Sequence, residues 1–137
     1  MSDLRDSLLS CYRDLGVGRG RVVFIASDFG RMLTDPRMDR QTVLGAHLSA
    51  LLEIVGDEGT VVVPTATLNL CNTKIVFDPL TTPSHQMGAF SEFVRLQQAA
   101  RRSFHPFWSL AGLGRHASEL VDDVSRHAFG MGSVWSR

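Results

Sequence analysis

Two stretches decide the fold of this chain, Val22-Val23-Phe24-Ile25-Ala26 and Thr60-Val61-Val62-Val63-Pro64. Both are continuous apolar runs rich in β-branched side chains, which is typical of strands buried on both faces of a parallel sheet. Between them, Thr42 is a good helix cap, and residues 42–55 carry apolar side chains at helical spacing. A strand, a helix and a strand in this order predict a right-handed β-α-β unit. The chain is therefore expected to be α/β, with both runs in one parallel or mixed sheet.

The rest of the chain predicts further helices and long loops. Residues 2–15 form an amphipathic helix capped by Ser2, a polar loop with a turn at Asp35-Pro36 follows residue 26, and residues 65–86 form a second polar loop. A helix from Met87 to the neighbourhood of Arg101-Arg102, a short strand over 107–112 and a helix over 114–124 complete the pattern. Two buried strands and one short strand are fewer than the roughly four to six of an open sheet, so the sheet is expected to be incomplete.

Composition narrows the class of protein. The chain has 137 residues, of which 44% are hydrophobic, which suits one domain or part of one. Fourteen basic and fourteen acidic side chains cancel, which argues against a nucleic-acid binder. No run reaches the roughly 18–20 apolar residues of a membrane span. The charged N-terminus is unlike a signal peptide, and Cys11 and Cys71 lack metal-site spacing, so we expect a cytoplasmic protein without a metal.

Few residues stand out as catalytic. The glycines at 16, 18 and 20 follow a helix and precede a strand, the reverse of a phosphate-binding loop, so we interpret them as a turn. No G-x-S-x-G nucleophile motif and no His/Glu pair at helical metal spacing occur. His85 and His105, both in loops, are better candidates for a site than His47 and His116, which we expect to be structural or solvated.

Polar side chains follow the predicted strands, where α/β proteins usually bind ligands. Ser27 and Asp28 follow the first strand, and Thr65 and Thr67 follow the second. Further along, the segment Arg101-Arg102-Ser103-Phe104-His105 gathers cationic and donor side chains. Such a cluster suits a phosphate group, although two arginines at a helix C-terminus also stabilise the helix dipole without any ligand.

Several segments resemble the aminoglycoside 3-N-acetyltransferase family in the family's own order. Leu15-Gly16-Val17 resembles its "LGV-x-x-G" turn, and the segment from Leu51-Leu52 to Thr65 resembles its "G-x-x-G-T-L-V-x-P-T" strand. The loop from Phe77-Asp78-Pro79 to Met87-Gly88, which includes Thr82-Pro83-Ser84, resembles the family's most distinctive loop. The later segments resemble its "R-S-x-H-P", "S-x-A-x-x-G" and "F-G-x-G-S" motifs, here Arg102–Pro106, Ser109–Gly114 and Phe129–Ser133.

The resemblance implies a three-layer α/β/α sandwich and transfer of an acetyl group from acetyl-CoA to an amino group. The acceptor would be an aminosugar, either an aminoglycoside antibiotic or a polysaccharide precursor. The resemblance implies that Asp78 lies on the substrate side, and that the CoA ligands come from the loop ends and the cationic segment: Ser27, Thr82, Ser84, Arg101, Arg102 and Ser103.

The resemblance is to the N-terminal half of the family only. Family members are roughly twice as long, and their catalytic base, a histidine in an "H-T-S-L-H-x-A-E"-like motif, belongs to the second half and has no counterpart here. Ala26 and Asp28 replace the family's histidine and second serine after the first strand. Alternatives therefore stay open: a non-enzymatic module that binds CoA or a partner chain, or an unrelated sugar-nucleotide binder. Self-association or pairing with a C-terminal half would cover the incomplete sheet.

Overall fold

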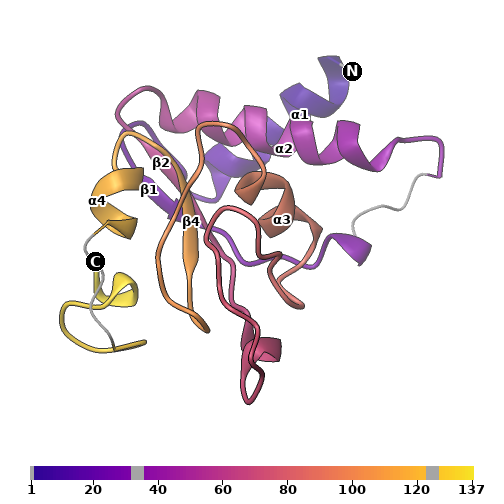
Figure 1. The fold of residues 1–137 in the computed structure, drawn as a ribbon. Coiled ribbons are helices and arrows are strands. Elements are labelled where there is room, and N and C mark those ends of the chain that lie inside the picture. The colour runs from indigo at the N-terminus through magenta and orange to yellow at the C-terminus, as the bar shows by residue number, and fades with distance from the viewer. Residues whose placement is uncertain (1, 32–35, 123–126) are drawn as a thin grey trace.

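The computed structural model describes residues 2–31, 36–122 and 127–137 (Figure 1). The predicted turn at Asp35-Pro36, the end of the predicted helix at Val124 and the capping side chain of Ser2 fall outside what it describes. Its elements in chain order are α1 (Ser2–Asp14), β1 (Val22–Phe24), η1 (Phe29–Arg31), α2 (Arg40–Val55), β2 (Thr60–Pro64), η2 (Leu68–Leu70), α3 (Ala89–Arg95), β3 (Arg101–Arg102), β4 (Leu110–Gly114), α4 (Ala117–Val121) and η3 (Val134–Ser136).

The described strands form one mixed sheet in the order β1-β2-β4-β3. β1 and β2 are parallel, with Val22 opposite Thr60, and α2 connects them. β4 runs antiparallel to both β2 and β3, with Val62 opposite Gly112. The sequence-based prediction of an α/β fold with 22–26 and 60–64 in one parallel or mixed sheet is confirmed.

Alternate residues of β2 divide the core into two layers, because successive side chains of a strand point to opposite faces. Val61 and Val63 pack with side chains of α2 and α3 in the main core. Val62 points to the other face, where it packs with Leu110 and Val134. On that face α4 lies over β4, since a Cβ at Gly112 would stand 3.4 Å from Ala117. Figure 1 shows α3 and α4 on opposite sides of β4.

Two predictions about the strands and helices are wrong. β1 is not buried on both faces, since Val22 and Phe24 are 49% and 48% exposed. It is an edge strand of the described sheet. Arg101 and Arg102 form strand β3 instead of ending a helix, because α3 already ends at Arg95 and the chain turns at residues 96–100. The later strand and helix are also displaced, to 110–114 and 117–121.

The start of α2 also differs from the prediction. Asp39, not Thr42, is the cap: its carboxylate accepts the backbone N–H of Thr42 at 2.9 Å and the hydroxyl at 3.0 Å. Farther along, His47 of α2 is buried and its Nδ1 lies 2.6 Å from the hydroxyl of Tyr12 in α1. His47 therefore has the structural role expected of it. In the described part of the chain, no helix is both long and apolar enough to cross a membrane.

Candidate cofactor and substrate site

Arg102 of β3 is the centre of a polar cluster that also includes Thr65, just after β2, and Ser109, just before β4. Its Nε donates to the hydroxyls of Ser109 at 3.0 Å and Thr65 at 3.2 Å. Its Nη2 donates to the carbonyl oxygen of Thr65 at 2.8 Å, and its Nη1 donates to the carbonyl oxygen of Thr82. The guanidinium therefore joins the first residue after β2 to the 78–84 loop.

An aromatic ring covers the same guanidinium. The Cζ atom of Arg102 stands 4.8 Å from the centroid of the Phe77 ring, within range of a cation–π contact. Burial, together with the nearby charge of Arg95, lowers the pKa of Arg102 to about 10, while Glu92 and Asp78 act in the opposite direction. Arg102 is thus charged at neutral pH, and most of its N–H donors are engaged with protein acceptors.

The loop from Asp78 to Ser84 is fixed by two further sets of hydrogen bonds. Asp78 and Thr82 bond reciprocally, since the N–H of Asp78 donates to the Thr82 hydroxyl at 2.8 Å and the N–H of Thr82 to the Asp78 carbonyl at 2.9 Å. The N–H and hydroxyl of Ser84 both donate to Oε1 of Glu92 in α3, at 2.8 and 2.6 Å. Arg95 binds the same carboxylate through two nitrogens, each at 2.8 Å.

Glu92 is ionised despite its partial burial. Burial alone would raise its pKa, but the hydrogen bonds from Arg95 and Ser84 and the charge of Arg95 outweigh it and lower the pKa to about 2. The carboxylate therefore anchors the loop through Ser84 and holds Arg95 in place at all but strongly acidic pH.

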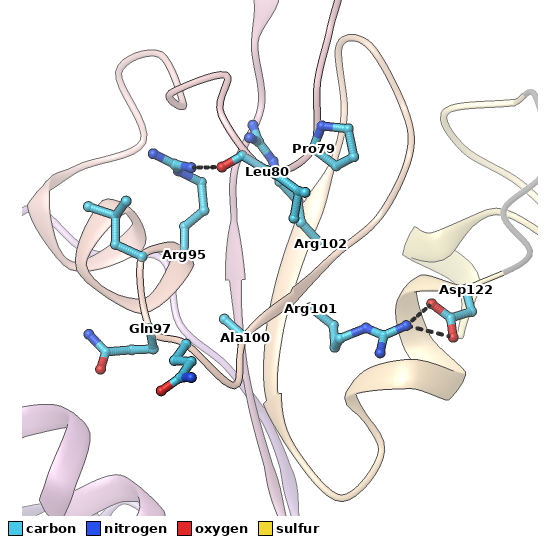
Figure 2. A pocket seen from close by; sticks show the side chains of 10 residues that line it. Pro79, Leu80, Arg95, Gln97, Ala100, Arg101, Arg102 and Asp122 are labelled. Atoms are coloured by element: carbon cyan, nitrogen blue, oxygen red, sulfur yellow. Dashed lines mark hydrogen bonds and ion pairs between the residues drawn. The ribbon is translucent and has the colours of Figure 1, made fainter.

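A cleft of about 580 Å³ opens beside β3, between the 79–80 segment and the turn after α3 (Figure 2). In Figure 2, Arg95 points toward the carbonyl of Leu80, while Arg101 points away to Asp122. The Arg101–Asp122 ion pair spans 3.2 Å, and both side chains are 55% exposed. The charged and amide side chains that line the cleft are Arg95, Arg101, Arg102, Asp122, Gln97 and Gln98.

The remaining predicted residues lie elsewhere. Ser103 is fully buried, and its hydroxyl accepts the backbone N–H of Leu110 at 2.9 Å, so it holds β3 to β4. Ser27 lies against the start of α3, where a Cβ on Gly88 would come within 2.6 Å of the Ser27 carbonyl oxygen. The hydroxyl oxygen of Ser27 is buried and has no hydrogen-bond partner among the described residues.

His105 is held in one tautomer. Its Nδ1 accepts the backbone N–H groups of Phe107 at 3.2 Å and Trp108 at 3.0 Å. A nitrogen that accepts carries no proton, so the neutral ring has its hydrogen on Nε2. The ring is 8% exposed, which makes His105 a fixed part of the 103–109 segment.

The structure thus divides the predicted site residues into separate places. It brings Asp78, Thr82 and Ser84 together with Arg102, but Arg101 lines the cleft with its guanidinium turned toward Asp122, and Ser27 lies against Gly88. The expected compact cluster of residues 101–105 does not form, because neighbouring residues of a strand point to opposite sides.

The sequence-based prediction of the site missed three residues. The i, i+3 spacing of Glu92 and Arg95 was a usable signal, and Ser109 opens the segment that resembles the family's "S-x-A-x-x-G" motif, although no pattern indicated its contact with Arg102.

Comparison with known proteins decides the family. The sequence profile of the aminoglycoside 3-N-acetyltransferase family matches residues 39–137. The chain belongs to this family. The YokD protein from Bacillus subtilis has the same fold, with a TM-score of 0.81 at 20% identity over 95% of this chain and 58% of YokD.

Two other solved structures hold ligands. AAC-VIa bound to sisomicin matches with a TM-score of 0.77 and 27% identity, over 97% of this chain and 54% of AAC-VIa. AAC-IIIb, solved as a binary complex with CoASH, matches with a TM-score of 0.78 and 23% identity, over 95% of this chain and 53% of AAC-IIIb. The chain therefore spans little more than half the length of these relatives. Within its described residues, no three His, Cys, Asp or Glu side chains gather as metal ligands.

Proposed function

We propose that residues 1–137 are the N-terminal, CoA-binding portion of a single-domain N-acetyltransferase that acetylates an amino group of an aminosugar. Family membership supports the reaction class, and relatives solved with CoASH and with sisomicin support a CoA cosubstrate and an aminoglycoside-like acceptor. The observation on this chain that carries the proposal is the cleft beside β3, which is lined by three arginines and one aspartate.

Arg101 is the guanidinium best placed to bind a CoA phosphate. Its ion pair with Asp122 is exposed, and such pairs contribute about 0–1 kcal/mol, so a phosphate replaces the carboxylate at little cost. Arg95 already binds Glu92, and Arg102 already binds backbone carbonyls. Both would therefore attract a phosphate by their charge more than by free N–H donors. Arginine and phosphate form charge-assisted, often bidentate hydrogen bonds, which suits the diphosphate of CoA.

The other predicted residues support the cleft wall. Thr82 and Ser84 shape the 78–84 loop, and Ser103 fixes β3. Ser27 differs from them, because its buried hydroxyl has no partner among the described residues, and only the family resemblance places it among the CoA ligands.

Asp78 would act on the substrate side. Its side chain is exposed on the same loop as Leu80, which lines the cleft, and a carboxylate there attracts the ammonium form of an aminosugar. Transfer requires the neutral amine: its nitrogen attacks the thioester carbonyl, the C–S bond breaks, and the thiol of CoA leaves with the proton that the amine loses. A general base must remove the proton from the amine, and we assign that role to no residue of this chain.

Calorimetric titration with CoA tests the proposal. We expect Arg101→Ala to weaken binding by about 1.5–3 kcal/mol, the usual worth of a hydrogen bond to a charged group, and by more at low salt. Arg115→Ala is the matched control, because Arg115 also forms an exposed 3.2 Å ion pair, with Glu58, away from the cleft. Equal effects of both substitutions, or none, would show that the cleft does not hold the CoA phosphates.

A further inference from the structure

The open edge of the sheet at β1 carries an apolar patch, here termed the β1 edge patch and comprising Val22, Phe24 and Trp135. Val22 and Phe24 are about half exposed, and the Phe24 ring lies 5.6 Å from the Trp135 ring. The three side chains border a hollow of about 230 Å³ that is otherwise lined by apolar side chains of β2, β4, α4 and η3 and by Arg137. Exposed apolar patches with aromatic side chains are characteristic of interfaces.

The backbone of this edge is also open. The N–H of Ile25 donates to Val62, and the carbonyl of Arg21 accepts from Thr60, so the odd-numbered residues of β1 face β2. The N–H and C=O groups of Val22 and Phe24 therefore point away from the described sheet, because these directions alternate along a strand. Such an edge is a template for pairing with another strand.

The charges on either side of β1 are complementary under a two-fold axis. Exposed Arg19 and Arg21 precede the strand, and exposed Asp28 follows it. If two copies of β1 pair antiparallel about Val23, Val22 of one copy lies opposite Phe24 of the other. In the same pairing, the chain leaves the end of each β1 toward Asp28 on the side where the Arg19–Arg21 segment of the other copy enters its strand. A two-fold interface needs this kind of self-complementary surface.

We propose that the β1 edge patch is a self-association surface, through which two copies of this chain pair antiparallel along β1. Val22 and Phe24 then exchange backbone hydrogen bonds across the axis and form apolar cross-strand pairs. The chain has no net charge, so long-range repulsion does not oppose the contact.

Sedimentation equilibrium of the 137-residue chain over a range of concentrations tests this proposal. We expect a reversible dimer whose dissociation constant rises about tenfold or more with Phe24→Lys, because a lysine on an edge strand blocks pairing. Val76→Lys is the matched control. Val76 is 85% exposed on the 65–86 loop, and its substitution should leave the dissociation constant unchanged. Circular dichroism of each variant confirms that the fold is kept.

A cross-link identifies the contact directly. Val23 would meet its own counterpart at a non-hydrogen-bonded position, where Cα atoms lie about 4.5 Å apart, a separation that a disulfide spans. In a background with exposed Cys11 and Cys71 changed to serine, Val23→Cys should give a covalent dimer on mild oxidation. A chain that stays monomeric throughout, as it would if its mate were instead the second half of a longer relative, overturns the proposal. So does a dimer that neither Phe24→Lys weakens nor Val23→Cys traps.

Discussion

Nη2 of Arg102 lies 2.8 Å from the carbonyl oxygen of Thr65 and donates a hydrogen bond to it. Thr65 is the first residue after β2, so this bond joins the end of the central strand to β3. The same guanidinium also holds the carbonyl of Thr82. Arg102 therefore fastens the 78–84 loop, which forms one wall of the cleft, to the sheet, while Glu92 and Arg95 hold the same loop to α3.

Arg102→Ala should lower the free energy of unfolding by about 2–4 kcal/mol, because it leaves buried acceptors without donors and removes the contact with Phe77. Arg101→Ala, whose side chain forms only an exposed ion pair, should cost less than about 1 kcal/mol. Urea unfolding measures both. Arg102→Lys keeps the charge but lacks the planar fork, so it should recover little of the loss. Equal losses at positions 101 and 102 would contradict this account of Arg102.

The stability of the chain should fall in acid partly through Glu92. Its pKa is about 2 in the folded protein, against an ordinary value of 4.5, so the folded state favours the ionised form. A carboxylate with a depressed folded pKa contributes its full stability above about pH 4.5, and that contribution shrinks as the pH falls toward 2. Urea unfolding at several pH values between 6 and about 3 measures the decline.

Glu92→Gln is the matched variant for this pH dependence. Glutamine keeps the shape but not the charge, so the variant should be less stable than the wild type at pH 6. The gap between the two should narrow as the pH falls below about 4.5, because the wild type then becomes protonated as well. A gap that is constant across the whole range would mean that Glu92 does not titrate with a depressed pKa.

The strands that make the centre of the fold were predictable because burial leaves a strong signal. All five positions of β2 are buried, as its unbroken apolar run indicates. The same signal misled at β1: Val22 and Phe24 are equally apolar, but their exposure depends on what lies beyond the sheet edge, which local sequence does not encode. β3 was missed because two residues are too few to show any periodicity. Arg101 and Arg102 are extended because they pair with β4, which comes later in the chain.

The candidate site was predictable in its location but not in its contacts. The loop after β2 and the Arg102 segment were both expected near a ligand, and the structure joins them through Thr65 and Thr82. The different contacts of Arg101 and Arg102, one with Asp122 and the other with the loop carbonyls, were not predictable. They depend on which side of a two-residue strand each side chain points to. Glu92 acquires its role only because Ser84 folds back onto it from eight residues away.

Gly88 should tolerate alanine poorly for two separable reasons. Its φ of +89° is unfavourable for a residue with a Cβ, and that Cβ would stand 2.6 Å from the carbonyl oxygen of Ser27. Gly16 has a φ of +88° but no atom within 4 Å of the Cβ position, so it isolates the backbone effect. Gly16→Ala should cost about 1–2 kcal/mol of stability, and Gly88→Ala about 1–3 kcal/mol more. Thermal unfolding of both variants would show equal costs if the approach to Ser27 were unimportant.

The 137-residue chain should bind CoA without turning over acetyl-CoA. The cleft and its arginines lie within the described residues, but the motif that carries the family's expected base has no counterpart in the sequence, and the loss of a general base lowers rates by about 10²–10⁴-fold. A thiol-release assay with acetyl-CoA and a panel of aminosugars, run beside the calorimetric titration, separates the two properties. Binding without turnover supports a portion of the enzyme that needs a further segment, or a module that only binds CoA. Multiple turnovers would show that a residue of this chain, with His85 and His105 the first to replace by glutamine, removes the proton from the amine.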